Sequence, residues 1–307
     1  MNFARLPRFK RNASFARIRL TDRDKEIIKM VFRYRFIRSS QILKLIEGSR
    51  QQSLRRLQLL YHHGFLERPR AQIDYYHQGG SRPMVYGIGN KGAALWKNEL
   101  NLQLKEHRWS DKNRSVGRIF LEHALLVSDI MVAFELACRA NNVRLLTEDE
   151  LRLVAKKENT RQPFRWNVNL STGEKLGVIP DRVFGLEYSD QTGKRERAFF
   201  FLEADRGTMP VKRESLSQTS FYRKLLAYEA TWSQSIHVSR FGFHRFRVLT
   251  VTTSTERLKS LVEVSAQLKT GQGLFLFTHT KFLASDLHML SAVWRTTKRA
   301  AFIRLLS

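Results

Sequence analysis

Residues 49–64 read SRQQSLRRLQLLYHHG, and this stretch predicts a helix with two recognisable ends. Ser49 is a preferred residue for a helix N-cap, and Gly64 supplies the left-handed conformation that commonly ends a helix. The apolar residues that recur at helical spacing between these ends are Leu54, Leu57 and Leu60 or Tyr61. Such spacing places one buried stripe along the helix and leaves the opposite side to polar side chains.

Two further helices precede this one, and a hairpin follows it. Thr21 can cap a first helix, and Ser39 can cap a short second helix. An extended stretch, a Gly79-Gly80 turn and an alternating segment at residues 84–88 predict the two strands of the hairpin. Three helices and a hairpin predict a winged helix-turn-helix domain over residues 21–99.

The exposed face of the 49–64 helix predicts contact with double-stranded DNA. It carries Arg50, Gln51, Gln52, Arg55 and Arg56. Arginine and glutamine can form paired hydrogen bonds with guanine and adenine edges in the major groove. The hairpin adds Arg68, Arg70 and Arg82 as candidate contacts with phosphates or with the minor groove. The alternatives are an ordinary solvated helix face or a winged helix that binds protein.

The charge of the chain supports a polyanionic partner. The sequence has 54 Lys and Arg against 28 Asp and Glu, a formal net charge of +26. Residues 1–110 hold 23 basic and 8 acidic residues, a net charge of +15, so positive charge is densest in the first third. Residues 1–20 contain only basic charges and predict a flexible arm that binds phosphates.

An anionic membrane is the rival partner, and the apolar pattern argues against it. No uninterrupted apolar run exceeds five residues, whereas a spanning helix needs about 20. The single Cys138 cannot form an internal disulfide or a cysteine-rich zinc site. We therefore expect no membrane partner, and a reducing cytoplasm as the compartment.

The remaining two thirds of the chain predict a mixed sheet covered by helices. The expected order is one long helix, three strands, a helix, a strand, a helix and a strand, which gives an α+β or α/β class. The predicted segments are a linker at 100–115, this domain at 116–283 and a basic C-terminal helix at 284–307.

Acidic side chains lie where two of the predicted strands end. Period-two alternation places Glu203 and Asp205 on the same face of a buried strand, and Asp181 follows Ile179-Pro180 on a neighbouring one. Buried carboxylates need a counter-ion, which is either an arginine or lysine or a divalent metal. Asp181 and Glu203 could hold Mg²⁺, which would activate water and stabilise charge on a phosphodiester.

The pattern of Pro180-Asp181 followed by Glu203-x-Asp205 resembles the PD-(D/E)XK restriction-endonuclease-like superfamily. More closely, residues 121–123 (LEH), 202–208 (LEADRGT) and 224–228 (KLLAY), together with the winged helix, resemble the bacterial plasmid replication-relaxation family. The resemblance spans about residues 20–280. It implies a DNA-binding protein of plasmids or integrative elements that acts in replication or prepares DNA for transfer.

One position departs from the nuclease pattern. Asp205 stands two residues after Glu203, where that pattern has its water-activating lysine. Lys224 on the following helix lies about 60° from the predicted buried face and can reach the strand end. Lys212 is a weaker substitute, and Arg206 could neutralise the acids without a metal.

Three hypotheses follow for the function. The first is a DNA-binding accessory protein of a mobile element that acts in replication, relaxation or transfer. Its expected partners are DNA and other replication, relaxation or transposition proteins, and it could form oligomers. The second is a Mg²⁺-dependent endonuclease with Asp181, Glu203, Asp205 and Lys224 as catalytic residues. The third is an autoregulatory transcription repressor.

Overall fold

The structure is a computed structural model. It describes residues 8–12, 18–73, 82–99, 108–154, 163–190, 192–284, 289–297, 302–303 and 305. The chain divides into two compact units, residues 1–129 and 130–307. The predicted Gly79-Gly80 turn and residues 100–107 of the predicted linker lie outside the described residues. Among those that are described, no helix combines the length and apolar character needed to cross a membrane.

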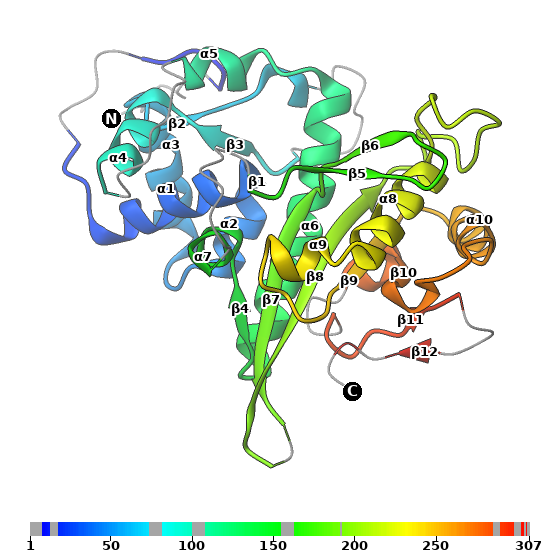
Figure 1. The fold of residues 1–307 in the computed structure, drawn as a ribbon. Coiled ribbons are helices and arrows are strands. Elements are labelled where there is room, and N and C mark those ends of the chain that lie inside the picture. Colours follow the sequence, from blue (N-terminus) through cyan, green and yellow to red (C-terminus); the bar gives the residue numbers. More distant parts are fainter. Residues whose placement is uncertain are drawn as a thin grey trace. The chain divides into compact units, whose positions relative to one another are not determined.

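The first unit contains a cluster of short helices and a small antiparallel sheet (Figure 1). Its elements are α1 (Asp22–Tyr34), β1 (Phe36–Arg38), α2 (Ser39–Leu45), α3 (Arg50–His62), β2 (Leu66–Glu67), η1 (Arg70–Gln72), β3 (Val85–Ile88), α4 (Asn90–Glu99), α5 (Trp109–Arg114) and the first half of α6 (Arg118–Ala140). The strand order is β1-β3-β2. The hairpin of β2 and β3 therefore forms, and β1 extends it as a third strand.

The helix ends in this unit follow the capping residues. The hydroxyl of Thr21 accepts a hydrogen bond from the backbone N–H of Asp24, and the Asp24 carboxylate bonds back to the cap. The hydroxyl of Ser49 accepts a hydrogen bond from the backbone N–H of Gln52 and so caps α3, and Gly64 has a φ of +83°, as predicted. Ser39 is the first residue of α2, whereas the sequence placed it at the cap.

The boundary between the units lies inside α6. Leu121 and Leu125 on the first turns of α6 form a buried cluster with Phe36 and Val85 of the small sheet. The hydroxyl of Ser128 donates a hydrogen bond to the Phe36 carbonyl oxygen at 2.6 Å. The first unit therefore ends at residue 129, whereas the sequence predicted the second domain to begin at residue 116.

The second unit is built on a seven-stranded mixed sheet of order β12-β11-β10-β9-β8-β7-β4. Strands β8, β9 and β10 are parallel to one another, and the other pairs are antiparallel. The elements are β4 (Arg144–Leu146), α7 (Glu148–Val154), β5 (Trp166–Asn169), β6 (Lys175–Val178), β7 (Arg182–Ser189), β8 (Arg195–Asp205), α8 (Phe221–Ser233), α9 (Ile236–Ser239), β9 (Arg247–Thr252), α10 (Thr255–Ser265), η2 (Gln272–Leu274), β10 (Phe275–His279), η3 (Thr280–Ala284), β11 (Trp294–Arg295) and β12 (Phe302–Ile303). The predicted mixed α/β architecture is confirmed.

The alternation of β8 gives the sheet two apolar faces. Phe200 packs with Phe184 of β7, which contacts Phe134 of α6 on one face. Phe201 points the other way, into a buried cluster that includes Tyr228 of α8 and residues of α10. The sheet is thus covered on both faces by helices, because successive side chains of a strand point to opposite sides.

The prediction of a basic C-terminal helix is wrong. Trp294–Arg295 and Phe302–Ile303 form β11 and β12, and Arg295 of β11 pairs with Phe277 of β10. Trp294 is fully buried. The edge of β10 exposes backbone N–H and C=O groups, and pairing with the last segment of the chain satisfies them.

Candidate functional site

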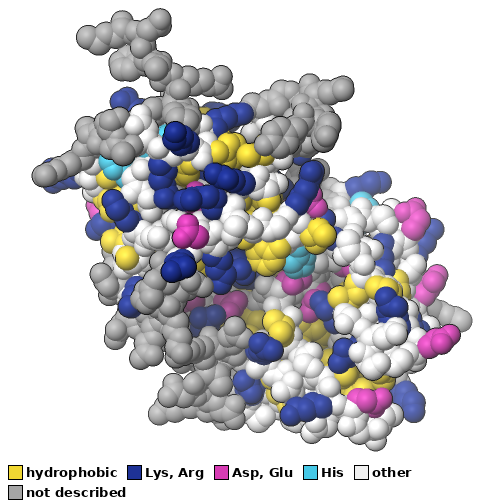
Figure 2. All heavy atoms as spheres, turned by 90° about the horizontal axis from the view of Figure 1, so that it is seen from above, with side chains coloured by type: hydrophobic (Ala, Val, Ile, Leu, Met, Phe, Trp, Pro, Cys, Tyr) yellow, Lys and Arg dark blue, Asp and Glu magenta, His cyan; other side chains and the backbone are white. Residues whose placement is uncertain are grey.

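The α3 helix presents a polar face that is rich in hydrogen-bond donors. Arg50, Gln51, Gln52 and Arg55 are all exposed. Leu57, Leu60 and Tyr61 of the predicted apolar stripe are buried, whereas Leu54 is 38% exposed, so the buried stripe is shorter than predicted. On the face of the molecule drawn in Figure 2, Lys and Arg side chains are spread widely and acidic side chains are fewer. These side chains supply hydrogen-bond donors, and phosphates and the edges of bases carry acceptors for them.

Arg56 has a different place from its neighbours on α3. Its guanidinium binds Asp24 of α1, with 2.8 Å between Nε and Oδ1, and Asp24 is fully buried. Although burial works to raise the pKa of Asp24, hydrogen bonds from Arg56 and Thr21 hold it below its usual value. Arg56 therefore joins α3 to α1 as an internal counter-ion, instead of facing a ligand with Arg55.

The predicted hairpin contacts divide in a similar way. Arg68 is buried: its Nη2 donates to the Tyr86 hydroxyl at 3.0 Å, and its guanidinium lies 4.1 Å from the Tyr61 ring centroid. Arg70 and Arg82 are exposed. Arg68 thus stabilises the interior of the unit, and only the other two present their side chains to solvent.

Part of the predicted basic arm is docked on the first unit. Arg11 binds the buried carboxylate of Glu67 at 2.7 Å, and its Nε donates to the Tyr61 carbonyl oxygen at 3.0 Å. The backbone N–H of Asn12 donates to Nδ1 of His62 at 3.1 Å. This part of the arm is held by neutralising a buried acid, which a charge count cannot reveal.

The buried His62 predicts a pH-dependent stability. Burial and the nearby Arg68 lower its pKa to about 4, below its ordinary value of 6.5. Between pH 6.5 and 4 the His62 imidazole therefore binds a proton in the unfolded chain but not in the folded chain. The free energy of unfolding falls as the pH drops through this range. At pH 4 the free energy of unfolding is about 3 kcal/mol lower than at neutral pH. Urea unfolding of the wild type and of His62→Gln at several pH values measures this loss. If the free energy of unfolding depends on pH as steeply in the variant as in the wild type, His62 is not the cause.

The second unit brings three of its predicted site residues to one end of β8. Lys224 of α8 contacts Glu203, with 2.5 Å between Nζ and Oε2, and the Tyr228 hydroxyl donates to Oε1 of Glu203 at 2.6 Å. Asp181 accepts a hydrogen bond from the backbone N–H of Ala204 at 2.8 Å. The prediction that Lys224 reaches the strand end is confirmed.

Asp205 has a partner that the sequence analysis did not identify. Arg257 binds it through two hydrogen bonds of 2.8 and 2.9 Å, and Thr252 donates to the same carboxylate at 2.8 Å. Arg257 lies in the first turn of α10, which Ser254 caps, directly after β9. The sequence feature that could have identified Arg257 is its place at the start of α10, the helix that follows β9, and β9 is a parallel neighbour of β8.

The charges of the cluster favour the protonated form of Lys224. Burial alone would lower the pKa of Lys224, but the charges of Glu203 and Asp181 raise it to about 12. Burial raises the pKa of Glu203, against the opposing effect of Lys224. These charges favour the ammonium form of Lys224 at neutral pH.

The arrangement around the acids fits protein cations better than a metal ion. Mg²⁺ accepts one or two carboxylates, which Asp181 and Glu203 could supply. Both oxygens of Glu203 are already bound, by Lys224 and Tyr228, and Arg257 binds both oxygens of Asp205. Within the described part of the chain, no group of three or more His, Cys, Asp or Glu side chains could hold a metal. As arranged, the site is an ion-pair cluster.

Lys212, the weaker substitute lysine, and Glu122 of the LEH motif each have a partner of their own. Lys212 donates to the side chain of Gln267 at 2.6 Å, so it does not serve as the substitute lysine. Glu122 pairs with Arg118 one turn away on α6, at 2.9 Å. Lys212 therefore does not join the acid cluster of Asp181, Glu203 and Asp205.

The fold and this cluster define a two-unit α/β protein in which a basic helical unit precedes a mixed sheet with buried acids at the end of the internal strand β8. The family model for replication-relaxation proteins matches residues 28–244, and the chain belongs to this family. Its membership indicates a role in replication or relaxation. No curated protein and no solved structure matches the chain.

Proposed function

We propose that this protein is a DNA-binding accessory factor of a plasmid or integrative element, acting in replication, relaxation or transfer. The observation that carries the proposal is the exposed face of α3, on which Arg50, Gln51, Gln52 and Arg55 stand together. The Arg56–Asp24 ion pair holds this helix against α1 from behind. A helix anchored on one side and lined with donors on the other is suited to the major groove.

The topology of the first unit supports a winged helix. Helices α1, α2 and α3 are followed by the β2–β3 hairpin, and β1 pairs with β3. In such a module the hairpin connection is the wing. Arg70 and Arg82 lie on this connection and are exposed, so they are suited to contact phosphates beside the groove.

The second unit supports a holding or recruiting role better than chemistry. Its layout of Asp181, Glu203 and Lys224 at a strand end resembles a restriction-endonuclease-like site with a displaced lysine. The acids are neutralised within the fold by Lys224 and Arg257. We infer that the unit keeps the shape of such a domain and offers a platform for DNA or for other replication or transfer proteins.

The salt dependence of binding tests the proposal. Fluorescence anisotropy with labelled duplexes, from 50 to 300 mM NaCl, should give a log Kd that rises linearly with log salt. The slope is about 0.9 for each phosphate contact, so four to six contacts give about 4 to 5. A duplex affinity that is insensitive to salt would refute DNA binding through these basic side chains.

A metal-dependent endonuclease is the second candidate, and the convergence of Asp181, Glu203 and Lys224 favours it. The test is incubation of supercoiled plasmid with 5 mM MgCl₂ or MnCl₂ and either wild type or Asp181→Ala. Nicked or linear plasmid from the wild type alone would establish the activity. Equal products from both proteins would show that Asp181 is not part of a catalytic site. If neither protein gives products, the endonuclease hypothesis is wrong and the accessory role remains.

A further inference from the structure

The second unit contains a cavity of about 500 Å³ at the end of the sheet where the parallel strands begin. Strand β8 begins at Arg195, whereas its pairing with β9 begins only at Phe200 and Arg247. The part of β8 before Phe200 therefore pairs with β7 on one side and with no described strand on the other. The cavity is lined by this part of β8, by the start of β9 and by residues of the 271–274 segment before β10. It lies at the opposite end of β8 from the acid cluster.

Two arginines of this cavity have no counter-ion among the described residues. Arg245 is exposed and Arg247 is half-buried, and neither forms an ion pair or a side-chain hydrogen bond with a described residue. The other two charged side chains of the lining are neutralised by neighbours: Arg197 binds Glu187 at 2.7 Å, and Glu196 pairs with the lysine two residues before it. Arg245 and Arg247 therefore leave two positive charges in excess, which favours an anionic ligand.

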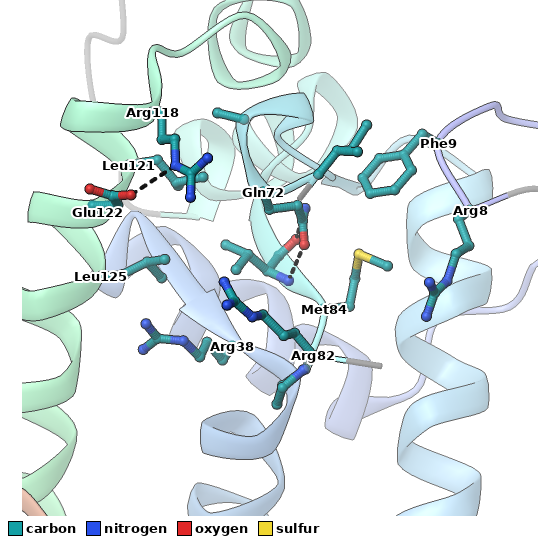
Figure 3. Close-up of a pocket in the computed structure, with 14 residues that line it drawn as sticks. Arg8, Phe9, Arg38, Gln72, Arg82, Met84, Arg118, Leu121, Glu122 and Leu125 are labelled. Carbon is teal, nitrogen blue, oxygen red and sulfur yellow. Dashed lines mark hydrogen bonds and ion pairs between the residues drawn. The ribbon is translucent and has the colours of Figure 1, made fainter. Parts of the chain in front are cut away.

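A cavity of about 350 Å³ in the first unit is also lined by arginines, but these are already engaged. Arg38 and Arg118 are paired with carboxylates, and Figure 3 shows the pair of Arg118 with Glu122. Arg8 and Arg82 have interaction partners as well. Of these two cavities, only that of the second unit is lined by arginines without a partner among the described residues.

Trp232 gives the cavity of the second unit an aromatic surface. Its indole stacks on the imidazole of His237, with 4.6 Å between the ring centroids and 8° between the planes, and Phe246 packs edge-on at 5.9 Å. His237 and Phe246 are buried, so they fix the orientation of the indole. Trp232 is nevertheless 36% exposed, which leaves part of its ring open to a ligand. A flat base can stack on such a ring.

We propose that this cavity binds single-stranded DNA, with one base stacked on Trp232 and the neighbouring phosphates on Arg245 and Arg247. An aromatic side chain beside cations is the combination with which proteins hold single strands without reading their sequence. Pockets of about 300–1,000 Å³ hold small molecules, so this one has room for a base with its sugar. The proposal goes beyond groove binding by α3, because it assigns a second site for a different form of DNA.

Two probes separate stacking from charge at this site. One is a labelled oligothymidylate of about eight nucleotides, and the other is an abasic oligonucleotide of the same length, which carries phosphates without bases. In anisotropy titrations of the full-length protein, Trp232→Ala should weaken binding of the oligothymidylate about tenfold or more, the scale on which one stacked base contributes. Its affinity for the abasic probe should stay within about twofold of wild type. Trp232→Phe keeps an aromatic ring and should retain part of the affinity.

The arginine variants test the phosphate contacts. Arg245→Ala and Arg247→Ala should each weaken binding of both probes, and the double variant should lower the slope of log Kd against log salt by about 1.4, since each contact with a single strand contributes about 0.7. Neither arginine bonds to another described side chain, so this test stands even where Trp232→Ala does not fold. Arg213→Ala is the control: this exposed arginine follows the other end of β8, and both affinities and the slope should stay unchanged.

Duplex binding, measured in parallel, separates this proposal from the role of α3. The variants of Trp232, Arg245 and Arg247 should keep their duplex affinity, and the Arg50/Arg55 double variant should keep its affinity for the oligothymidylate. Equal weakening of the base-bearing and abasic probes by Trp232→Ala would overturn the proposal, as would full affinity in all the variants of the cavity.

Other ligands give three further outcomes that would overturn it. Thymidine monophosphate that binds as tightly as the oligothymidylate would make the ligand a free nucleotide. An oligouridylate that binds more tightly than the oligothymidylate would make it RNA. An acidic peptide that binds more tightly than either strand, and loses affinity in Trp232→Ala, would make the cavity a docking site for protein.

Discussion

Replacing both Arg50 and Arg55 with alanine should weaken binding of the cognate duplex about a hundredfold at 150 mM salt. Each arginine that reaches a base edge or a phosphate contributes about 1–3 kcal/mol, and each 1.4 kcal/mol is a factor of ten. Both side chains are exposed, so their removal leaves the packing of α3 intact. Anisotropy titrations with the same labelled duplex measure the change, and the slope against log salt should fall as well.

The control for this prediction is a charge removed elsewhere. Arg195 is exposed at the start of β8 in the second unit, and Arg195→Ala should keep the affinity within about twofold of wild type. Arg56→Ala should behave differently from both, because it leaves the carboxylate of Asp24 buried without its cation and lowers stability. An affinity of the Arg50/Arg55 double variant equal to that of Arg195→Ala would show that α3 does not carry the binding.

Replacing Lys224 with methionine should lower the free energy of unfolding by about 2–3 kcal/mol at pH 7. The change leaves Glu203, whose side chain is 3% exposed, without its cation. Breaking a buried ion pair costs about 3–5 kcal/mol, and the 35% exposure of the Lys224 side chain places this case at or just below the lower end of that range. Urea unfolding followed by circular dichroism gives the value.

A double variant separates the ion pair from the packing of α8. Lys224→Met combined with Glu203→Gln removes both charges, so it should recover most of the stability that the single variant loses. Lys224→Arg keeps a cation near the carboxylate and should lose less than Lys224→Met. A single variant as stable as wild type would mean that Glu203 does not depend on Lys224, and the cluster would need another explanation.

Local features of the fold were predictable because they depend on neighbours in the chain. The caps at Thr21 and Ser49 and the end of α3 at Gly64 follow from side chains that satisfy the nearest backbone groups. The contact of Lys224 with Glu203 was also predictable from the sequence, because helical geometry sets the direction of Lys224 once the buried face of α8 is known. Whether these residues act on DNA stays a prediction.

What the sequence alone determined was therefore the kind of each segment, the excess of basic charge, and the face on which each periodic side chain lies. Only the tertiary structure decided which charges are paired across the fold. Arg56 binds Asp24, Arg68 lies against Tyr61, and Arg257 binds Asp205. Such pairs join residues far apart in the chain, and they depend on the order of strands and the packing of helices.

The same reason explains the end of the chain. Residues 294–304 have the composition of a basic amphipathic helix, yet their described parts form strands, because the edge of β10 offers backbone partners that local propensity does not include. Periodicity reports the environment along one segment. Strand pairing and ion pairing across the fold depend on which surfaces meet, and that is settled only when the whole chain has packed.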